Sequence, residues 1–298
     1  MKLKNTLALA MAAVLAAGLT ACGSSADTTS PAADSTAAES TEAAADGDGD
    51  PTTLTVAMEC AYAPYNWTQS DDANGAVEIR GSSDYAYGYD VMMAKKIGEA
   101  LGQKVQIVKL DWDSLIPAVM SGDVDCVIAG QSITADRAAQ VDFSDPYYYA
   151  SIITLTKKDS AYANATSVAD LAGATATSQL GTIWYEICLP QIPGASIQPA
   201  AESAPAMLMA LETGAVDFIC TDMPTAQGAL IAYPDLVLLD FTGTEDNFQV
   251  SDEEVNIGIS MRKGNTELKA AIDGVLSGMT AQDFNDMMAQ ATAIQPIQ

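Results

Sequence analysis

The chain has 298 residues, of which 39 are acidic and 13 are basic, and its formal net charge is −26 at pH 7. Such an acidic balance excludes nucleic acid as a partner, because phosphate binding needs clustered lysine and arginine. The sequence contains no histidine, which excludes histidine-based triads, histidine general bases and histidine-ligated metal sites.

Residues 1–21 are predicted to be a lipoprotein signal peptide. Lys2 and Lys4 form a basic start, and residues 7–19 form an apolar run too short to span a bilayer. The sequence Leu-Thr-Ala-Cys at 19–22 resembles a lipobox, which implies that Cys22 becomes the lipidated first residue of the mature protein, with palmitate among its acyl chains. An ordinary secretory signal with a chance cysteine is the alternative.

Residues 22–53 are predicted to be a disordered acidic tether. From residue 23 onward the segment has no aromatic or large aliphatic residue, so it cannot bury enough apolar area to offset its ordering entropy. No later segment is long and apolar enough to cross a bilayer. We therefore expect a folded domain on the extracytoplasmic face of the cell membrane, held there by the lipid anchor only.

The first part of the folded region alternates strand and helix patterns. Residues 54–58 and 104–110 read as strands, and residues 88–101 read as a helix with one apolar face that Gly102 ends. Residues 69–85 form a polar insertion, expected as a loop or hairpin near the rim of a cleft.

The stretch that organises the chain follows the short apolar strand at residues 125–128. The strand should end near Gly130, and Ser132 or Thr134 can then cap a helix that begins around residue 135. This order places Ser132 and Arg137 at the carboxyl end of a strand, where open α/β sheets bind ligands. An arginine there offers a planar fork that matches a carboxylate. The alternative is a capping serine beside a solvated arginine.

Residues 130–148, which read GQSITADRAAQVDFSDPYY, resemble the central signature of bacterial extracellular solute-binding proteins of family 3, the polar amino-acid receptors of ABC importers. Further motifs of that family follow in the expected order over about 54–298. The resemblance implies a two-lobed α/β fold of the periplasmic-binding-protein type II. Each lobe would be an open, mostly parallel sheet flanked by helices, with the ligand in the cleft between the lobes.

The resemblance also implies domain limits. Lobe 1 is expected to be discontinuous, over 54–153 and 257–298, and lobe 2 to span 154–256. The chain would cross to lobe 2 near 149–156 and return through 255–264.

The same resemblance assigns ligand contacts in lobe 1. The run Tyr-Ala-Pro-Tyr at 62–65 places Tyr62 against the ligand side chain, and Trp112 lines the pocket opposite. Gly130, Ser132 and Arg137 belong to the central signature. For Tyr62 and Trp112, packing into the protein's own core is the alternative.

Two motifs of lobe 2 complete the expected site. Gln179 to Thr182 resembles a glycine turn that opens a helix, whose free amides suit a carboxylate. Asp222 occupies the position of the aspartate that takes the ligand's ammonium group, with helix capping as the alternative. Gln131 stands where the family usually has an apolar residue, so it could reach the ligand.

The expected function is therefore delivery of a polar L-amino acid to the permease and ATPase subunits of an importer, by a monomeric protein that needs no cofactor or metal. Glu59 favours a basic ligand, because basic-amino-acid members of the family carry an acidic residue there, whereas Arg80 could instead meet an acidic ligand. The alternatives are a dehydratase-type enzyme on the same fold, with Glu59 as general acid, and a sensor for a signalling partner.

Four cysteines remain after Cys22, and their spacing contains no CxxC pair. They are expected as mostly buried thiols. A disulfide between Cys188 and Cys220 is the alternative.

Overall fold

The computed structural model describes residues 50–296, apart from the side chains of residues 252 and 253. The predicted signal peptide, lipidation site and nearly all of the predicted tether lie outside these residues. Among the described residues, no helix has the length and apolar character needed to cross a membrane. Residues 50–296 belong to one compact unit that contains two five-stranded sheets.

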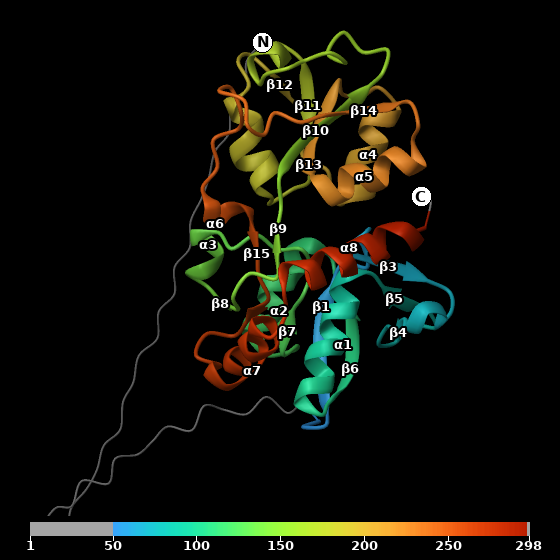
Figure 1. Ribbon diagram of the computed structural model, residues 1–298, viewed down its shortest axis with the longest axis vertical. Helices are drawn as coiled ribbons and strands as arrows, with labels where there is room; N and C mark the ends of the chain where they lie inside the picture. The colour runs from blue at the N-terminus through green and yellow to red at the C-terminus, as the bar shows by residue number, and fades with distance from the viewer. Residues whose placement is uncertain (1–49, 297–298) are drawn as a thin grey trace, which may run out of the picture. The chain divides into compact units, whose positions relative to one another are not determined.

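The first sheet defines lobe 1, drawn in the lower half of Figure 1. Its strand order is β6-β1-β7-β16-β8. In that order, the strands are Lys104–Lys109, Thr53–Met58, Cys126–Val127, Ser260–Met261 and Asp142–Phe143. Strand β1 pairs in parallel with β6 and β7, and β16 runs antiparallel to β7 and β8.

The second sheet defines lobe 2, drawn in the upper half of Figure 1. Its strand order is β12-β11-β13-β10-β14. In that order, the strands are Ser196–Ile197, Thr175–Thr177, Phe218–Asp222, Ile152–Lys157 and Leu236–Leu239. Strand β10 runs antiparallel to both β13 and β14, whereas β11 is parallel to β12 and β13.

The sheets are thus less parallel than expected from the sequence. The antiparallel strands β10 and β16 are the ones by which the chain enters lobe 2 and returns to lobe 1. A strand that arrives from the other lobe needs no helical crossover within its own sheet, and only parallel neighbours require such a crossover. Between the two sheets, β9 (Tyr148–Tyr149) pairs antiparallel with β15 (Asn256–Ile257).

Helices flank both sheets. Their bounds are α1 Tyr89–Leu101, α2 Leu115–Ser121, α3 Ala135–Ala138, α4 Ala204–Glu212, α5 Met223–Ala232, α6 Asp252–Val255, α7 Thr266–Ser277 and α8 Ala281–Ile294. Helix α1 ends as predicted at Gly102, which has a left-handed φ of 68°. Helix α8 packs against α1 of lobe 1 and also against α5 of lobe 2.

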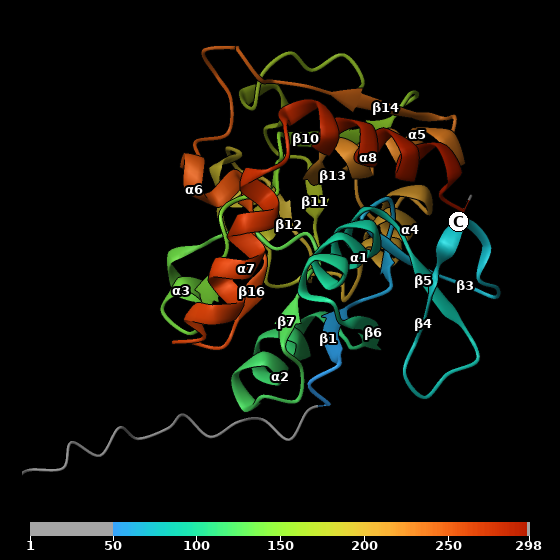
Figure 2. The same ribbon diagram turned by 60° about the horizontal axis from the view of Figure 1, so that its bottom comes forward.

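The insertion at 69–85 forms a hairpin, one of the two expected forms, but it lines neither of the cavities described below, contrary to the expected place at a cleft rim. A small sheet has the order β2-β3-β5-β4, with bounds Ala61–Tyr62, Asn66–Gln69, Tyr85–Tyr87 and Val77–Glu78. Its Ile79 bridges to Ile107, and the Arg80 N–H donates to the Ile107 carbonyl, so the hairpin lies along the outer edge of β6. Figure 2 shows β3, β4 and β5 on the side of the molecule where β6 lies.

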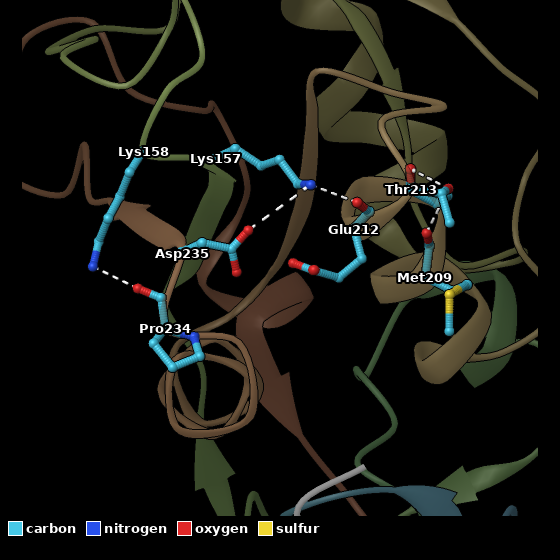
Figure 3. Close-up of polar contacts among 8 residues, drawn as sticks. Lys157, Lys158, Met209, Glu212, Thr213, Pro234 and Asp235 are labelled. Carbon is cyan, nitrogen blue, oxygen red and sulfur yellow. Dashed lines mark hydrogen bonds and ion pairs between the residues drawn. The ribbon is translucent and has the colours of Figure 1, made fainter.

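The end of β10 is fastened to two neighbouring elements of lobe 2 (Figure 3). Lys157 Nζ donates to the Glu212 carbonyl at the end of α4 and lies 3.9 Å from an Asp235 carboxylate oxygen. Lys158 Nζ donates to the Pro234 carbonyl before β14. These contacts hold the outer part of the lobe 2 sheet together.

The four cysteines in the described residues are buried free thiols, as predicted. They lie within the apolar cores of the two lobes, and burial raises the pKa of the Cys60 and Cys220 thiols to about 12. None is therefore a reactive thiolate near neutral pH.

Candidate functional site

A small cavity of about 10 Å³ lies where the two lobes meet. The residues that line it come from both lobes and include seven of the nine ligand contacts predicted from the sequence. They are Tyr62, Trp112, Gly130, Ser132, Arg137, Gln179, Thr182, Ile183 and Trp184. We call this the clamp cavity.

Arg137 is the cation of the clamp cavity. It lies on α3, whose first turn is capped by Thr134, because the Thr134 hydroxyl accepts from the Arg137 N–H. The guanidinium donates to the Ser132 carbonyl at 2.9 Å and, across to lobe 2, to the Gly181 carbonyl at 2.8 Å. It also lies 5.2 Å from the centroid of the Trp112 ring, a cation–π distance.

Arg137 keeps donors to spare. A guanidinium has five N–H donors, and in the described residues two of them are used by carbonyls. Burial lowers the pKa of Arg137 to about 10, so the side chain stays charged at neutral pH. A partly desolvated arginine with free donors is suited to an incoming carboxylate.

A buried polar network fixes the loop that carries Gly130. The Gly130 N–H donates to the Tyr147 hydroxyl at 3.0 Å, and that hydroxyl donates to Asp90 Oδ1 at 2.7 Å. Asn66 donates to the other Asp90 oxygen at 2.7 Å. Burial raises the pKa of Asp90 to about 7, against the lowering effect of these hydrogen bonds. The sequence predicted Gly130 but not this support beneath it.

Tyr62 forms one wall and links the lobes. Its ring stacks on Tyr65 with centroids 4.7 Å apart and lies tilted against Trp184. Its hydroxyl donates to Asp222 Oδ2 in lobe 2.

Asp222 does not itself line the clamp cavity. Its Oδ1 accepts from the Thr225 N–H at 2.8 Å and caps α5, so the capping role held as the alternative is present. The side chain is 1% exposed, and burial raises its pKa. A buried carboxylate directly behind Tyr62 remains available to balance a cation at this end of the cavity.

The turn from lobe 2 enters the cavity through Gln179 and Thr182. The Thr182 hydroxyl donates to the Gln179 carbonyl at 2.7 Å and closes the turn. The helix expected to follow is instead a five-residue π turn, Trp184–Cys188, that continues into a 3₁₀ turn, Leu189–Gln191. Because Pro190 in this second turn has no N–H to continue the helix, the segment lacks the regular helix predicted from the sequence.

Glu59 lies beside the clamp cavity, on a second and wider cavity. Its Oε2 accepts from Gln179 Nε2 at 3.1 Å, which is another bond between the lobes. Burial, with smaller contributions from nearby Asp111 and Asp113, raises the pKa of Glu59 to about 7.

Two sequence expectations about contacts are wrong. Gln131 is 2% exposed, and its Oε1 accepts from the Ser260 hydroxyl at 3.0 Å, so it faces the interior of lobe 1. Arg80 is exposed on the hairpin, and neither cavity is lined by any residue of 69–85.

Ile183 and Trp184 line the cavity but were not predicted as contacts. Both directly follow the predicted turn, and an aromatic two residues after Thr182 was the available signal. In the described residues, no group of three or more acidic or cysteine side chains is placed to hold a metal ion.

Two α/β lobes joined by paired strands, with an arginine and buried carboxylates gathered where they meet, define a two-lobed solute receptor. Residues 54–290 match the family of bacterial extracellular solute-binding proteins, family 3. The chain belongs to this family.

Similar proteins bind amino acids. The L-cystine-binding protein TcyA of Bacillus subtilis is 28% identical over 93% of this chain and 92% of its own. The arginine-binding protein ArtP of B. subtilis is 32% identical over 62% of this chain, and the match spans 59% of ArtP. The L-arginine-bound crystal structure of AbpA from Streptococcus pneumoniae has a TM-score of 0.68 and 26% identity, over 81% of this chain and 95% of AbpA.

Proposed function

We propose that this protein binds a basic L-amino acid outside the cytoplasm and passes it to an ABC importer, without catalysing a reaction. The observation that carries this proposal is the clamp cavity, where Arg137 meets the turn at Gly181. Buried Asp222 and Glu59 adjoin the same cavity through Tyr62 and Gln179.

An amino acid is a zwitterion, and both of its charges need partners when buried. The α-carboxylate would lie on the free donors of Arg137, with the backbone amides of Ser132 and Thr182. The ammonium would lie toward Asp222, with the Gly130 carbonyl and the Ser132 hydroxyl. Tyr62 and Trp112 would flank the side chain.

A basic side chain is supported by Glu59 and by the relatives. The cavity beside Glu59 is lined by further acidic residues, and a cation approaching it meets mostly negative charge. ArtP is an arginine-binding protein, and the AbpA structure contains bound L-arginine. Arginine, lysine or ornithine are therefore proposed ahead of glutamine or cystine.

Thermal denaturation in the presence of each standard amino acid tests the proposal. A ligand at 100 times its Kd stabilises by about 2.7 kcal/mol through mass action, so basic amino acids should raise Tm by several degrees. Stabilisation only by glutamate, aspartate or branched aliphatic amino acids would contradict it.

Glu59 should make affinity for a basic ligand depend on pH. Its pKa is raised to about 7, so its anionic, cation-binding form is lost as pH falls below 7. From pH 8 to pH 6 the Kd for arginine should therefore rise about tenfold. Calorimetry on Glu59→Gln should give a weaker and nearly flat profile, with neutral ligands little affected. A variant that keeps the wild-type pH dependence would remove Glu59 from the site.

A dehydratase-type activity is the second candidate, because Glu59 has the raised pKa of a general acid. One similar structure is the ancestral amino acid-binding protein AncCDT-1, described as a precursor of cyclohexadienyl dehydratase, with 29% identity and a TM-score of 0.64 over 80% of this chain and 94% of its own. Turnover of a cyclic hydroxy acid, followed by NMR, would favour this candidate over binding alone.

Membrane attachment is proposed to occur through Cys22 alone, with residues 1–21 removed as a signal peptide. Cys22→Ser should release the protein from the membrane fraction, because the lipid would be lost and residues 50–296 contain no helix able to span a membrane. Fractionation of cells that express each form is the measurement. A variant that stays with membranes as fully as wild type would show that the lipoprotein assignment is wrong.

Lobe 1 is proposed to comprise 54–153 and 257–298, and lobe 2 to comprise 154–256, in a monomeric receptor. A role as ligand sensor for a signalling partner would use the same site, and importer knockout strains that still respond to the ligand would favour it.

A further inference from the structure

The second cavity, on which Glu59 lies, is much larger than a basic side chain requires. It has a volume of about 530 Å³ and is open to the surface, where several of its lining residues are exposed. We call it the acidic cavity. Its lining residues are Glu59, Ala61, Lys109, Leu110, Asp111, Trp112, Asp113, Ser114, Leu180, Glu202 and Ser203.

The acidic residues at its mouth are not engaged by the protein. Within residues 50–296, the carboxylates of Asp111, Asp113 and Glu202 accept no hydrogen bond and form no ion pair. The single basic lining residue, Lys109, donates to the Thr68 hydroxyl at 3.1 Å. The carboxylates of Asp111, Asp113 and Glu202 outnumber the Lys109 ammonium, so the mouth presents a net negative field.

Glu59 points independently to a ligand at the inner end of this cavity. It is 5% exposed, and only its Oε2 is used, by Gln179. In the described part of the chain, its Oε1 accepts no hydrogen bond. This oxygen remains in contact with the open space of the acidic cavity, where an incoming cation or donor can satisfy it.

The acidic cavity and the clamp cavity are neighbours. Trp112 lines both cavities, and Gln179 of the clamp cavity is bonded to Glu59 of the acidic cavity. A ligand held by its α-carboxylate at Arg137, with its cation at Glu59, would point the end of its side chain into the acidic cavity.

We propose that the substrate class extends to basic amino acids that carry a neutral or cationic substituent on the side-chain nitrogen, and that anionic substituents are rejected. This inference rests on the proposed binding of basic amino acids. The volume beyond Glu59 accepts the substituent, and Asp111, Asp113 and Glu202 oppose negative charge there.

Calorimetry at low ionic strength with three ligands tests the inference. These are L-arginine, Nω-propyl-L-arginine and argininosuccinate, which all keep the guanidinium. We expect the propyl derivative to bind within about fivefold of arginine, and argininosuccinate to bind at least about 30-fold more weakly, which corresponds to about 2 kcal/mol of repulsion. The triple variant Asp111→Asn, Asp113→Asn, Glu202→Gln should reduce the difference in affinity between arginine and argininosuccinate.

A variant that narrows the acidic cavity supplies the steric control. Ser114 lines the cavity and is exposed, and its side chain caps no helix. Ser114→Trp should weaken the binding of Nω-propyl-L-arginine at least about tenfold more than the binding of arginine. Ser277→Trp, at an exposed position of α7, should change the affinity for neither ligand.

The outcomes separate the two proposals. If arginine fails to bind, the proposed function is wrong. If arginine binds but wild type rejects the propyl derivative as strongly as argininosuccinate, the inference is overturned. The inference is also overturned if argininosuccinate binds as well as arginine, or if Ser114→Trp affects both ligands equally.

Discussion

Arg137→Ala should abolish most of the affinity for an amino acid while leaving the fold intact. Removing one partner of a buried, hydrogen-bonded charge pair costs about 2–5 kcal/mol, which is roughly a 30- to several-thousand-fold rise in Kd. The reason is that the ligand carboxylate would keep its desolvation cost and lose the guanidinium donors. The affinity of Arg137→Lys should fall between those of wild type and Arg137→Ala, because an ammonium keeps the charge but loses the planar fork.

Arg80→Ala is the matched control, because it also removes one positive charge and its arginine is exposed on the hairpin away from both cavities. Calorimetry should give wild-type affinity for Arg80→Ala, and thermal melts without ligand should show both variants folded. If Arg137→Ala binds within about threefold of wild type, less than 1 kcal/mol, Arg137 does not hold the carboxylate.

The site was predictable from the sequence where local patterns decide the geometry. Strand β7 ends at Val127, and the left-handed Gly130 and a capped turn that follow it bring Ser132 and Arg137 to the same edge of the sheet. The turn at Gly181, also left-handed, brings Gln179 and Thr182 to the facing edge of lobe 2. Both turns depend on residues that are close in the sequence, and the order of the family motifs indicated that they face each other across a cleft.

Contacts between distant segments could not be predicted in the same way. The bond from Tyr62 to Asp222 joins residues 160 positions apart, and it depends on how the two lobes meet. Gln131 shows the same limit, because its partner Ser260 lies 129 positions away in the sequence. Its side chain faces Ser260 because β16 returns to the sheet beside β7, and no pattern around residue 131 indicates this.

Local sequence patterns could not predict the direction of the strands either. Strand β10 looks like any buried β-rich strand, and its antiparallel pairing with β13 follows from where the chain enters lobe 2. The sequence indicated a loop or hairpin for the insertion, but it did not indicate the bridge from Ile79 to Ile107 that places it on β6.

Gly130→Ala should disrupt both stability and binding, through a contact that only glycine allows. A Cβ at this position would lie 2.6 Å from Tyr62 Cε1 and 3.4 Å from Tyr65 Cδ1, and φ is already +62°. The loop cannot easily retreat, because the Gly130 N–H is held by Tyr147. The left-handed conformation costs an alanine about 1–2 kcal/mol, and overpacking adds about 1–3 kcal/mol.

Gly102→Ala separates these two contributions. Gly102 has a similar φ of +68°, and no atom lies within 4 Å of a Cβ built there, so it reports the conformational cost alone. Urea unfolding should show Gly130→Ala less stable than Gly102→Ala by about 1–3 kcal/mol. Calorimetry should show weaker ligand binding only for Gly130→Ala, because the displaced Tyr62 ring would lose its place in the cavity wall and its bond to Asp222. Equal stability and equal affinity in the two variants would mean that Tyr62 does not pack on Gly130.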